Sequence, residues 1–288
     1  MMKTLKTTFL LTVLTLLLLG IGQAFGGQRG LTMALGFAIL MNGTAYFFSD
    51  KIALSSAGAQ PISREQAPRL YAVMERLAGK ANIPMPKLYL IPQPAPNAFA
   101  TGRNPSHASV AVTAGLLELM NDEELEGVIA HELSHVRNYD ILTSSIAATL
   151  AGAITWVAQM GRWGMIFGGW GGGRDNDREG GGGGLVALLM LFLAPLAALL
   201  LQLGVSRQRE YQADASGAKM VGHPYGLISA LEKLGAYNKK IPTDISPSTA
   251  ALCIVQPLTA GQIFSSLFST HPPLEDRIAK LRSMTVTR

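Results

Sequence analysis

The apolar residues of the chain are concentrated in four long stretches that contain no charged side chain. They cover residues 7–22, 31–48, 141–161 and 185–205. Because about 20 apolar residues cross the hydrocarbon core of a bilayer, the last two stretches are long enough, and the first two lie within or near the tolerated range. Pro195 in the last stretch is tolerated in lipid, where neighbouring helices satisfy the freed backbone groups. The pattern predicts four transmembrane helices arranged as two hairpins.

The first stretch also has features of a signal peptide. Lys3 and Lys6 precede a short leucine-rich core, as in segments that are cleaved during secretion. However, no convincing small-x-small cleavage site follows Gly22, and the second apolar stretch begins soon after it. With or without cleavage, residues 31–48 would carry the following chain to the same side of the membrane.

The basic residues near the ends of the four stretches predict the orientation. Eight Lys and Arg residues lie on one side of the membrane and four on the other. Since basic loops stay in the cytoplasm, the two long polar segments are expected there.

Loop 162–184, with ten glycines in residues 168–184, is typical of a flexible external linker. The expected parts are a transmembrane hairpin over 1–50, a cytoplasmic part over 51–140, a second transmembrane hairpin over 141–205 and a second cytoplasmic part over 206–288.

The composition supports a membrane protein. Of the 288 residues, 48% are apolar and 15% are charged, whereas soluble proteins carry about a quarter charged residues. The net charge of +5 comes from scattered basic residues, so attraction to anionic lipid explains it better than nucleic acid does. Cys253 is the single cysteine, which excludes an intrachain disulfide and a thiolate zinc cluster. Any metal must therefore be held by histidine and carboxylate side chains.

The polar segment before the third apolar stretch predicts a small α+β unit. Residues 64–80 repeat apolar side chains at helical spacing, and the proline-rich run 84–96 must be extended or turning. Residues 97–101 and 108–113 are short β-prone runs around an Asn-Pro turn, which predicts a hairpin.

The next helix carries a metal-binding motif. Asn121 precedes three acidic residues and predicts a capped helix that reaches at least residue 138 and could continue into the third apolar stretch. His131 and His135 are four residues apart, so their imidazoles point the same way and can bind one Zn²⁺. Glu132 is rotated by about 100°, which aims its carboxylate at a water beside the metal. The alternative is an accidental match on a solvated helical face.

A hydrolytic zinc needs a third protein ligand, because three ligands and one water complete its coordination. The extended motif with a third nearby histidine is absent, since residues 138 and 141 are Asn and Ile. Glu210 is the best candidate, and Asp214 lies one helical turn further on. One of these carboxylates can bind the metal while the other accepts a hydrogen bond from a liganding histidine. A solvated amphipathic helix would explain the same segment without metal.

The second predicted hairpin would bring these distant residues together beside the membrane. His135 lies six residues before one apolar stretch and Glu210 five residues after another, so both lie within about 10 Å of the bilayer if the helices continue. Substrates would then come from the lipid or its edge.

The metal-binding motif, the Glu210 segment and the stretches around them resemble the M48 family of membrane zinc metalloproteases, in particular its bacterial heat-shock members. The resemblance covers nearly the whole chain. The resemblance implies four transmembrane helices with a gluzincin-type α+β domain, and one Zn²⁺ per chain held by His131, His135 and Glu210. It also implies Glu132 as catalytic base, with Asp214 supporting a zinc ligand. The expected setting is the bacterial inner membrane, with cytoplasmic cleavage of damaged or misassembled membrane proteins. The matching stretches are NAFATGRNPSHASVAVTAGLL (97–117), DEELEGVIAHELSHVRNYD (122–140), SRQREYQADASGA (206–218) and STHPPLEDRIAKL (269–281).

Two further roles follow from the resemblance. Asn97, Ala98, Phe99 and Ala100 resemble the strand beside the cleft of thermolysin-like enzymes, which pairs with an extended peptide through its backbone. An ordinary core hairpin would explain these residues equally well.

His271, with Arg277, resembles an HPPxxxR element that approaches the substrate carbonyl and would stabilise the oxyanion. A histidine that fixes the start of a helix is the alternative, and Tyr211 is a rival donor.

Two other functions compete with quality-control proteolysis. A prenyl-peptide protease shares the metal motif, but four predicted spans argue against its larger membrane barrel. A non-proteolytic membrane scaffold with structural zinc predicts four filled coordination positions, and three ligands can be named here. The predicted partners are the bilayer and unfolded or membrane-protein substrates, whereas the sequence leaves the oligomeric state open.

Overall fold

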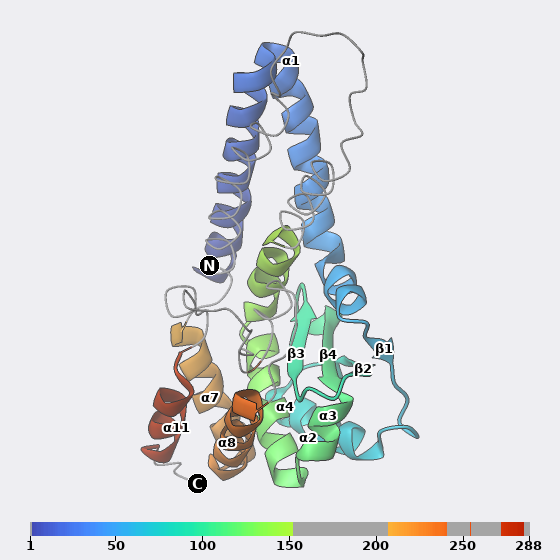
Figure 1. Cartoon of the computed structure of the whole chain (residues 1–288), viewed down its shortest axis with the longest axis vertical. Coiled ribbons are helices and arrows are strands. Elements are labelled where there is room, and N and C mark those ends of the chain that lie inside the picture. The colour runs from blue at the N-terminus through green and yellow to red at the C-terminus, as the bar shows by residue number, and fades with distance from the viewer. Residues whose placement is uncertain (1, 152–206, 241–253, 255–271, 285–288) are drawn as a thin grey trace.

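The structure is a computed structural model that describes residues 2–151, 207–240, 254 and 272–284. Helices predominate, and one four-stranded sheet lies beside them (Figure 1). The helices are α1 (Met2–Ser56), α2 (Pro68–Ala81), α3 (Ala114–Leu119), α4 (Asp122–Arg137), α7 (Arg207–Val221), α8 (Tyr225–Lys240) and α11 (Leu274–Arg282). The strands are β1 (Gln60–Pro61), β2 (Lys87–Ile91), β3 (Ala98–Gly102) and β4 (Ala108–Thr113).

Helix α1 is bent into two arms that rise away from the rest of the chain (Figure 1). The bend lies at Gly27, whose φ of 54° and ψ of −141° are outside the helical region and are accessible to glycine. The predicted stretches 7–22 and 31–48 lie in the two arms. Among the described residues, Gly26–Ser56 is long and apolar enough to cross a membrane. Four spans are therefore not confirmed, and residues 162–184 and 185–205 lie outside the described part.

A shorter apolar helix, Asp140–Ala151, enters the space between the two arms (Figure 1). Its Ile146 and Leu150 pack with Ala45 of the second arm. Its Thr143 forms a 2.9 Å hydrogen bond between hydroxyl groups with Thr7 of the first arm. The start of the third predicted apolar stretch is thus packed against the N-terminal hairpin.

The sheet has the strand order β1-β2-β4-β3. Strands β3 and β4 form the predicted antiparallel hairpin, in which Ala98 pairs with Val112. The proline-rich run, predicted to be extended or turning, contains β2, which pairs in parallel with β4. Only five residues separate Pro86 from Pro92, and they have the β-prone sequence KLYLI. Strand β3 lies at one edge of the sheet.

Alternate residues of the sheet face two different cores. Ala98, Ala100 and Val110 belong to the main core, which also contains the buried side chains of α4. Phe99 and Ala111 point to the other face and pack with the end of α1. The sheet therefore links the end of α1 to the helix with the metal-binding motif.

Helix α4 begins as predicted and ends earlier than the sequence allowed. Asn121 and Glu124 exchange two 2.9 Å hydrogen bonds between side chain and backbone, which form a capping box. The helix ends at Arg137, and Tyr139 has a φ of 61°. This left-handed residue separates α4 from the helix Asp140–Ala151, so the two are not one straight helix.

The contact between α4 and α8 depends on Gly127. A Cβ atom at this position would lie 2.5 Å from the backbone nitrogen of Leu227, which cannot move independently of its helix. We expect Gly127→Ala to lower the free energy of unfolding by about 1–3 kcal/mol. Gly79→Ala is the control, because no atom lies within 4 Å of that Cβ position, and it should gain up to about 1 kcal/mol. Equal thermal unfolding temperatures for the two variants would contradict this packing.

Candidate active site

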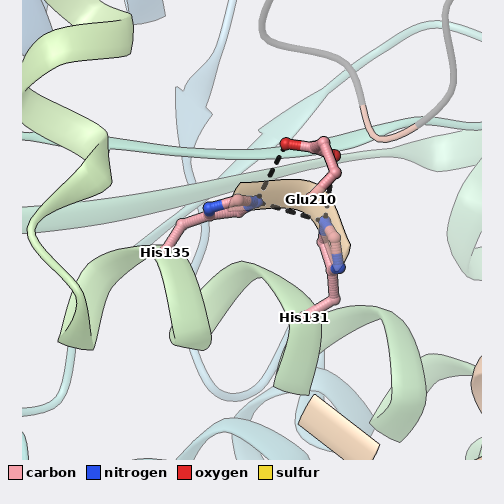
Figure 2. Close-up of side chains that lie close together, drawn as sticks. All are labelled: His131, His135 and Glu210. Atoms are coloured by element: carbon pink, nitrogen blue, oxygen red, sulfur yellow. Dashed lines mark hydrogen bonds and ion pairs between the residues drawn. The ribbon is translucent and has the colours of Figure 1, made fainter. Parts of the chain in front are cut away.

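Three predicted metal ligands from two helices meet at one point. His131 and His135 lie on α4 with their Nε2 atoms 3.2 Å apart, and Glu210 approaches from α7 (Figure 2). Its Oε1 lies 3.4 Å from Nε2 of His135, and its Oε2 lies 3.7 Å from Nε2 of His131. His131 and Glu210 are buried, and His135 is mostly buried.

The three side chains fit a zinc ion. At Zn–N distances of 2.0–2.1 Å, tetrahedral coordination separates two ligand atoms by about 3.3 Å, close to the spacing of these atoms. Two imidazole nitrogens and a carboxylate oxygen are the ligands of many hydrolytic zinc sites. Among the described residues, one group of His, Cys, Asp and Glu side chains suits a metal ion, and it consists of His131, His135 and Glu210.

Asp214 supports the ring of His131 from behind. Its Oδ1 lies 2.9 Å from Nδ1 of His131, on the side of the ring away from the ligand atom. Arg277 donates to both oxygens of Asp214, from Nε at 2.8 Å and from Nη2 at 2.7 Å. Burial alone would raise the pKa of Asp214, but the charge and hydrogen bonds of Arg277 lower it to about 2. Asp214 is therefore a carboxylate that holds the ring.

The position of Arg277 differs from the predicted substrate contact. Its side chain is 1% exposed, and Nη1 donates to the backbone carbonyl of Ile254 at 2.7 Å. Burial lowers its pKa, whereas the neighbouring carboxylates, Asp214 first, raise it above the usual range. Arg277 thus lies behind His131, where its donors are directed at protein groups. His271, its predicted partner, lies outside the described residues.

The side chain of Glu132 extends from α4 toward the edge strand β3. Its side chain is buried, and its carboxylate accepts a hydrogen bond from the backbone N–H of Ala100 in β3. Burial raises the pKa of Glu132 to about 8, helped by the charge of Glu210 and opposed by His135. Burial thus favours the neutral carboxyl group, whereas the hydrogen bond from Ala100 favours the carboxylate.

The predicted peptide-binding strand lies at the edge of the sheet. The backbone groups of Ala98 and Ala100 point away from β4, because Asn97 and Phe99 occupy the hydrogen-bonded positions of the ladder. The Asn97 Oδ1 accepts from the N–H of Ala98 at 2.8 Å and from that of Ile254 at 3.3 Å. The ring of Phe99 is buried against the end of α1 and its backbone groups face β4, so Ala98 and Ala100, and not Phe99, have backbone groups on the outer edge.

Asp140 is a further site residue that the sequence pattern did not indicate. Its Oδ2 lies 3.4 Å from Nδ1 of His135, so the second histidine also has a carboxylate behind its ring. Burial alone would lower the pKa of His135, but the hydrogen bond with Asp140 and the charges of Glu210 and Glu132 raise it to about 8. For His131, burial dominates and lowers the pKa.

Comparison with known proteins identifies the family. The sequence profile described as "Peptidase family M48" matches residues 63–285, which contain all the site residues described above. The chain belongs to peptidase family M48. It is therefore a metalloprotease, and zinc is the metal that M48 peptidases use.

Similar M48 proteins cover nearly the whole chain. The chain is 54% identical over 276 residues to "Protease HtpX homolog" of Desulfatibacillum aliphaticivorans, covering 96% of this chain and 88% of the relative. It is 52% identical over 283 residues to "Protease HtpX homolog" of Thermodesulfovibrio yellowstonii, covering 98% and 99%.

A solved structure shares the fold. The crystal structure of S. mikatae Ste24p matches with a TM-score of 0.52 and 20% identity over 98% of this chain. This M48 chain spans 65% of the length of that Ste24p chain. The HtpX relatives and the Ste24p fold together indicate a membrane protein.

In this M48 protease we expect Asp214→Ala to weaken zinc binding by about 10–100-fold, because the ring of His131 loses its support. The change also leaves Arg277 buried without its main partner, which costs about 3–5 kcal/mol of stability. Zinc competition with a chelator and thermal unfolding measure the two effects. Asp276→Ala, an exposed acid next to Arg277, is the control. Unchanged zinc affinity would show that Asp214 does not hold His131 in place for zinc binding.

The same carboxylate predicts a pH dependence. The pKa of Asp214 in the folded protein is about 2, below the ordinary 3.8. Its contribution to the free energy of unfolding is therefore complete above about pH 4 and is lost as the pH falls through 2. The free energy of unfolding of zinc-free Asp214→Asn should therefore vary less with pH between 4 and 2 than that of the wild type. Parallel acid-unfolding curves would contradict the ion pair.

Proposed function

We propose that the chain is a membrane-bound zinc endopeptidase that cleaves misfolded or damaged membrane proteins on the cytoplasmic side of the bacterial inner membrane. The observation that carries the proposal is the buried group of His131, His135 and Glu210 beside Glu132. This group lies next to the junction with the helix Asp140–Ala151, which packs between the arms of α1. The names of the HtpX relatives agree with a protease.

The residues of the site suggest a separate role for each side chain in peptide hydrolysis. Zn²⁺ bound by His131, His135 and Glu210 would polarise the scissile carbonyl and make water a better nucleophile. Glu132 accepts the proton of the attacking water and delivers it to the departing amine. The backbone N–H of Ala100 holds the Glu132 carboxylate in place during both transfers. Asp214 and Arg277 keep the ring of His131 oriented.

The edge of β3 suggests how a substrate is held. No strand in the described part of the chain pairs with the outer edge of β3, where the backbone carbonyls of Ala98 and Ala100 point away from β4. An extended peptide can add to such an edge through main-chain hydrogen bonds, which impose little side-chain specificity. A folded protein rarely offers an extended segment of this kind, so unfolded or damaged chains would be the preferred substrates.

The orientation rests on the basic residues and the apolar helices. Lys51 lies near the end of α1, with its ammonium group 5.4 Å from the ring centroid of Phe48, and Arg103 lies over Phe47. Both basic side chains are thus next to the last turns of the apolar helix, on the side of the proposed active site. Basic residues at a membrane boundary favour the cytoplasmic face.

The test compares a membrane protein in folded and unfolded form as substrate for the purified protease. The proposal predicts cleavage of the unfolded form, loss of cleavage with a chelator and recovery with zinc. Cleavage restricted to a prenylated peptide would favour the prenyl-peptide protease instead. One bound zinc without cleavage of any substrate would favour a scaffold with structural zinc.

A further inference from the structure

The support of His135 continues beyond Asp140 to a second arginine. Oδ1 of Asp140 lies 3.6 Å from Nη1 of Arg209, while Oδ2 of Asp140 faces Nδ1 of His135 at 3.4 Å. The three side chains are 12–15% exposed, so solvent screens the contacts only in part. His135, Asp140 and Arg209 thus repeat the order histidine, aspartate, arginine seen in His131, Asp214 and Arg277.

The two arginines differ in their place in the chain. Arg277 lies on α11, a separate helix near the C-terminal end of the chain. Arg209 directly precedes the proposed zinc ligand Glu210 on α7. Asp140 is the first residue of the apolar helix Asp140–Ala151. The contact between Arg209 and Asp140 therefore connects two parts of the site. Arg209 is next to the proposed ligand Glu210, whereas Asp140 contacts the proposed ligand His135 and begins the helix that packs between the arms of α1.

The backbone turn makes this contact available. In a continuous helix a residue five positions after His135 would be rotated by about 140° from it and would face elsewhere. The left-handed conformation of Tyr139, with a φ of 61°, ends the helical path and returns Asp140 toward the imidazole. Such a conformation is unfavourable for tyrosine and persists when the surrounding structure holds it.

We propose that Asp140 is a positioning residue for His135, and that Arg209 holds Asp140 in place, so that the junction with the apolar helix fixes the geometry of the zinc site. This inference rests on the proposed function only in taking His135 as a zinc ligand. An acidic residue at a helix start also favours the helix through its dipole, a structural role that would affect stability and not metal affinity.

The test measures zinc affinity of the full-length protein in detergent by competition with a chromophoric chelator. Asp140→Ala is expected to weaken zinc binding by about 10–100-fold and to alter the visible spectrum of the Co²⁺-loaded protein. Arg209→Ala should weaken zinc binding in the wild-type background and have no further effect in Asp140→Ala. Asp140→Asn, which keeps an oxygen acceptor for Nδ1–H and loses the charge for Arg209, should lie between the wild type and Asp140→Ala.

The control is the exposed ion pair between Arg69 and Asp122 at the other end of α4. Asp122→Ala removes an acid from a helix start without touching the site, so its zinc affinity and Co²⁺ spectrum should equal those of the wild type. Equal zinc affinity in Asp140→Ala and Asp122→Ala would overturn the inference, as would additive effects of Asp140→Ala and Arg209→Ala. If Asp140→Ala does not fold, Asp140→Asn decides by the same comparison.

Failure of this inference can be told apart from failure of the proposed function. If Glu132→Gln is inactive and Asp140→Ala binds zinc normally, the inference alone fails. If Glu132→Gln still cleaves, the proposed mechanism fails, whatever the zinc affinities of the Asp140 variants.

Discussion

Replacing Glu132 by glutamine is expected to lower the rate of peptide cleavage by about 10²–10⁴-fold while one zinc per chain is retained. The reason is that an amide cannot accept the proton of the attacking water, yet it has nearly the shape of the carboxylate. Its oxygen can still accept the hydrogen bond from the backbone of Ala100. Cleavage of an unfolded protein and the metal content of the purified variant are the measurements.

The matched control for this prediction is Glu123→Gln, in the first turn of the same helix. The Glu123 side chain is 56% exposed and lies far along α4 from the site. Its activity should equal that of the wild type. Glu132→Gln with wild-type cleavage would rule out Glu132 as the base.

The second large effect is expected for Glu210→Gln, which should reduce zinc affinity by more than the roughly 10–100-fold that loss of a supporting residue costs. A neutral amide is a poor zinc ligand, and the two histidines alone leave the coordination incomplete. Cleavage should fall with zinc occupancy and return in part when zinc is added in excess. Chelator competition and activity against zinc concentration measure both effects.

Gln208→Ala is the control for Glu210→Gln, because Gln208 is exposed two residues earlier on α7. It should bind zinc with wild-type affinity. If Glu210→Gln also did so, the third ligand would have to be another residue, and the geometry in Figure 2 would have no bearing on metal binding.

Local patterns made the centre of the site predictable. The spacing of His131 and His135 fixes their relation within one helix, and the capping box at Asn121 confirms where that helix begins. Glu210 was predicted because a zinc site lacked a ligand, and the structure places its carboxylate beside both imidazoles. Asp214 followed from the helical repeat and lies against His131.

Other features depend on tertiary contacts that the sequence does not encode locally. Asp140 lies five positions after His135, and only the turn at Tyr139 brings it to the imidazole. The bend at Gly27 falls between two stretches that were predicted as separate helices, so the hairpin could be expected but the residue at which the chain turns could not. The pairing of β2 with β4 joins segments that a hairpin pattern does not relate.

Arg277 shows a different limit of prediction. Its resemblance to the HPPxxxR element suggested that Arg277, with His271, stabilises the oxyanion, whereas its side chain is buried and paired with Asp214. A buried arginine needs a carboxylate partner, and that partner lies 63 residues away in the sequence. No local pattern identifies such a pair.

In the proposed site, one zinc ion is bound by two imidazoles and the carboxylate of Glu210. X-ray absorption at the zinc edge of the purified protein tests it most directly. We expect nitrogen and oxygen donors at about 2.0–2.1 Å, with outer-shell scattering from two imidazole rings and loss of the bound zinc in Glu210→Gln. A sulfur donor at about 2.3 Å, which Cys253 would have to supply, or an unchanged spectrum in Glu210→Gln would contradict it.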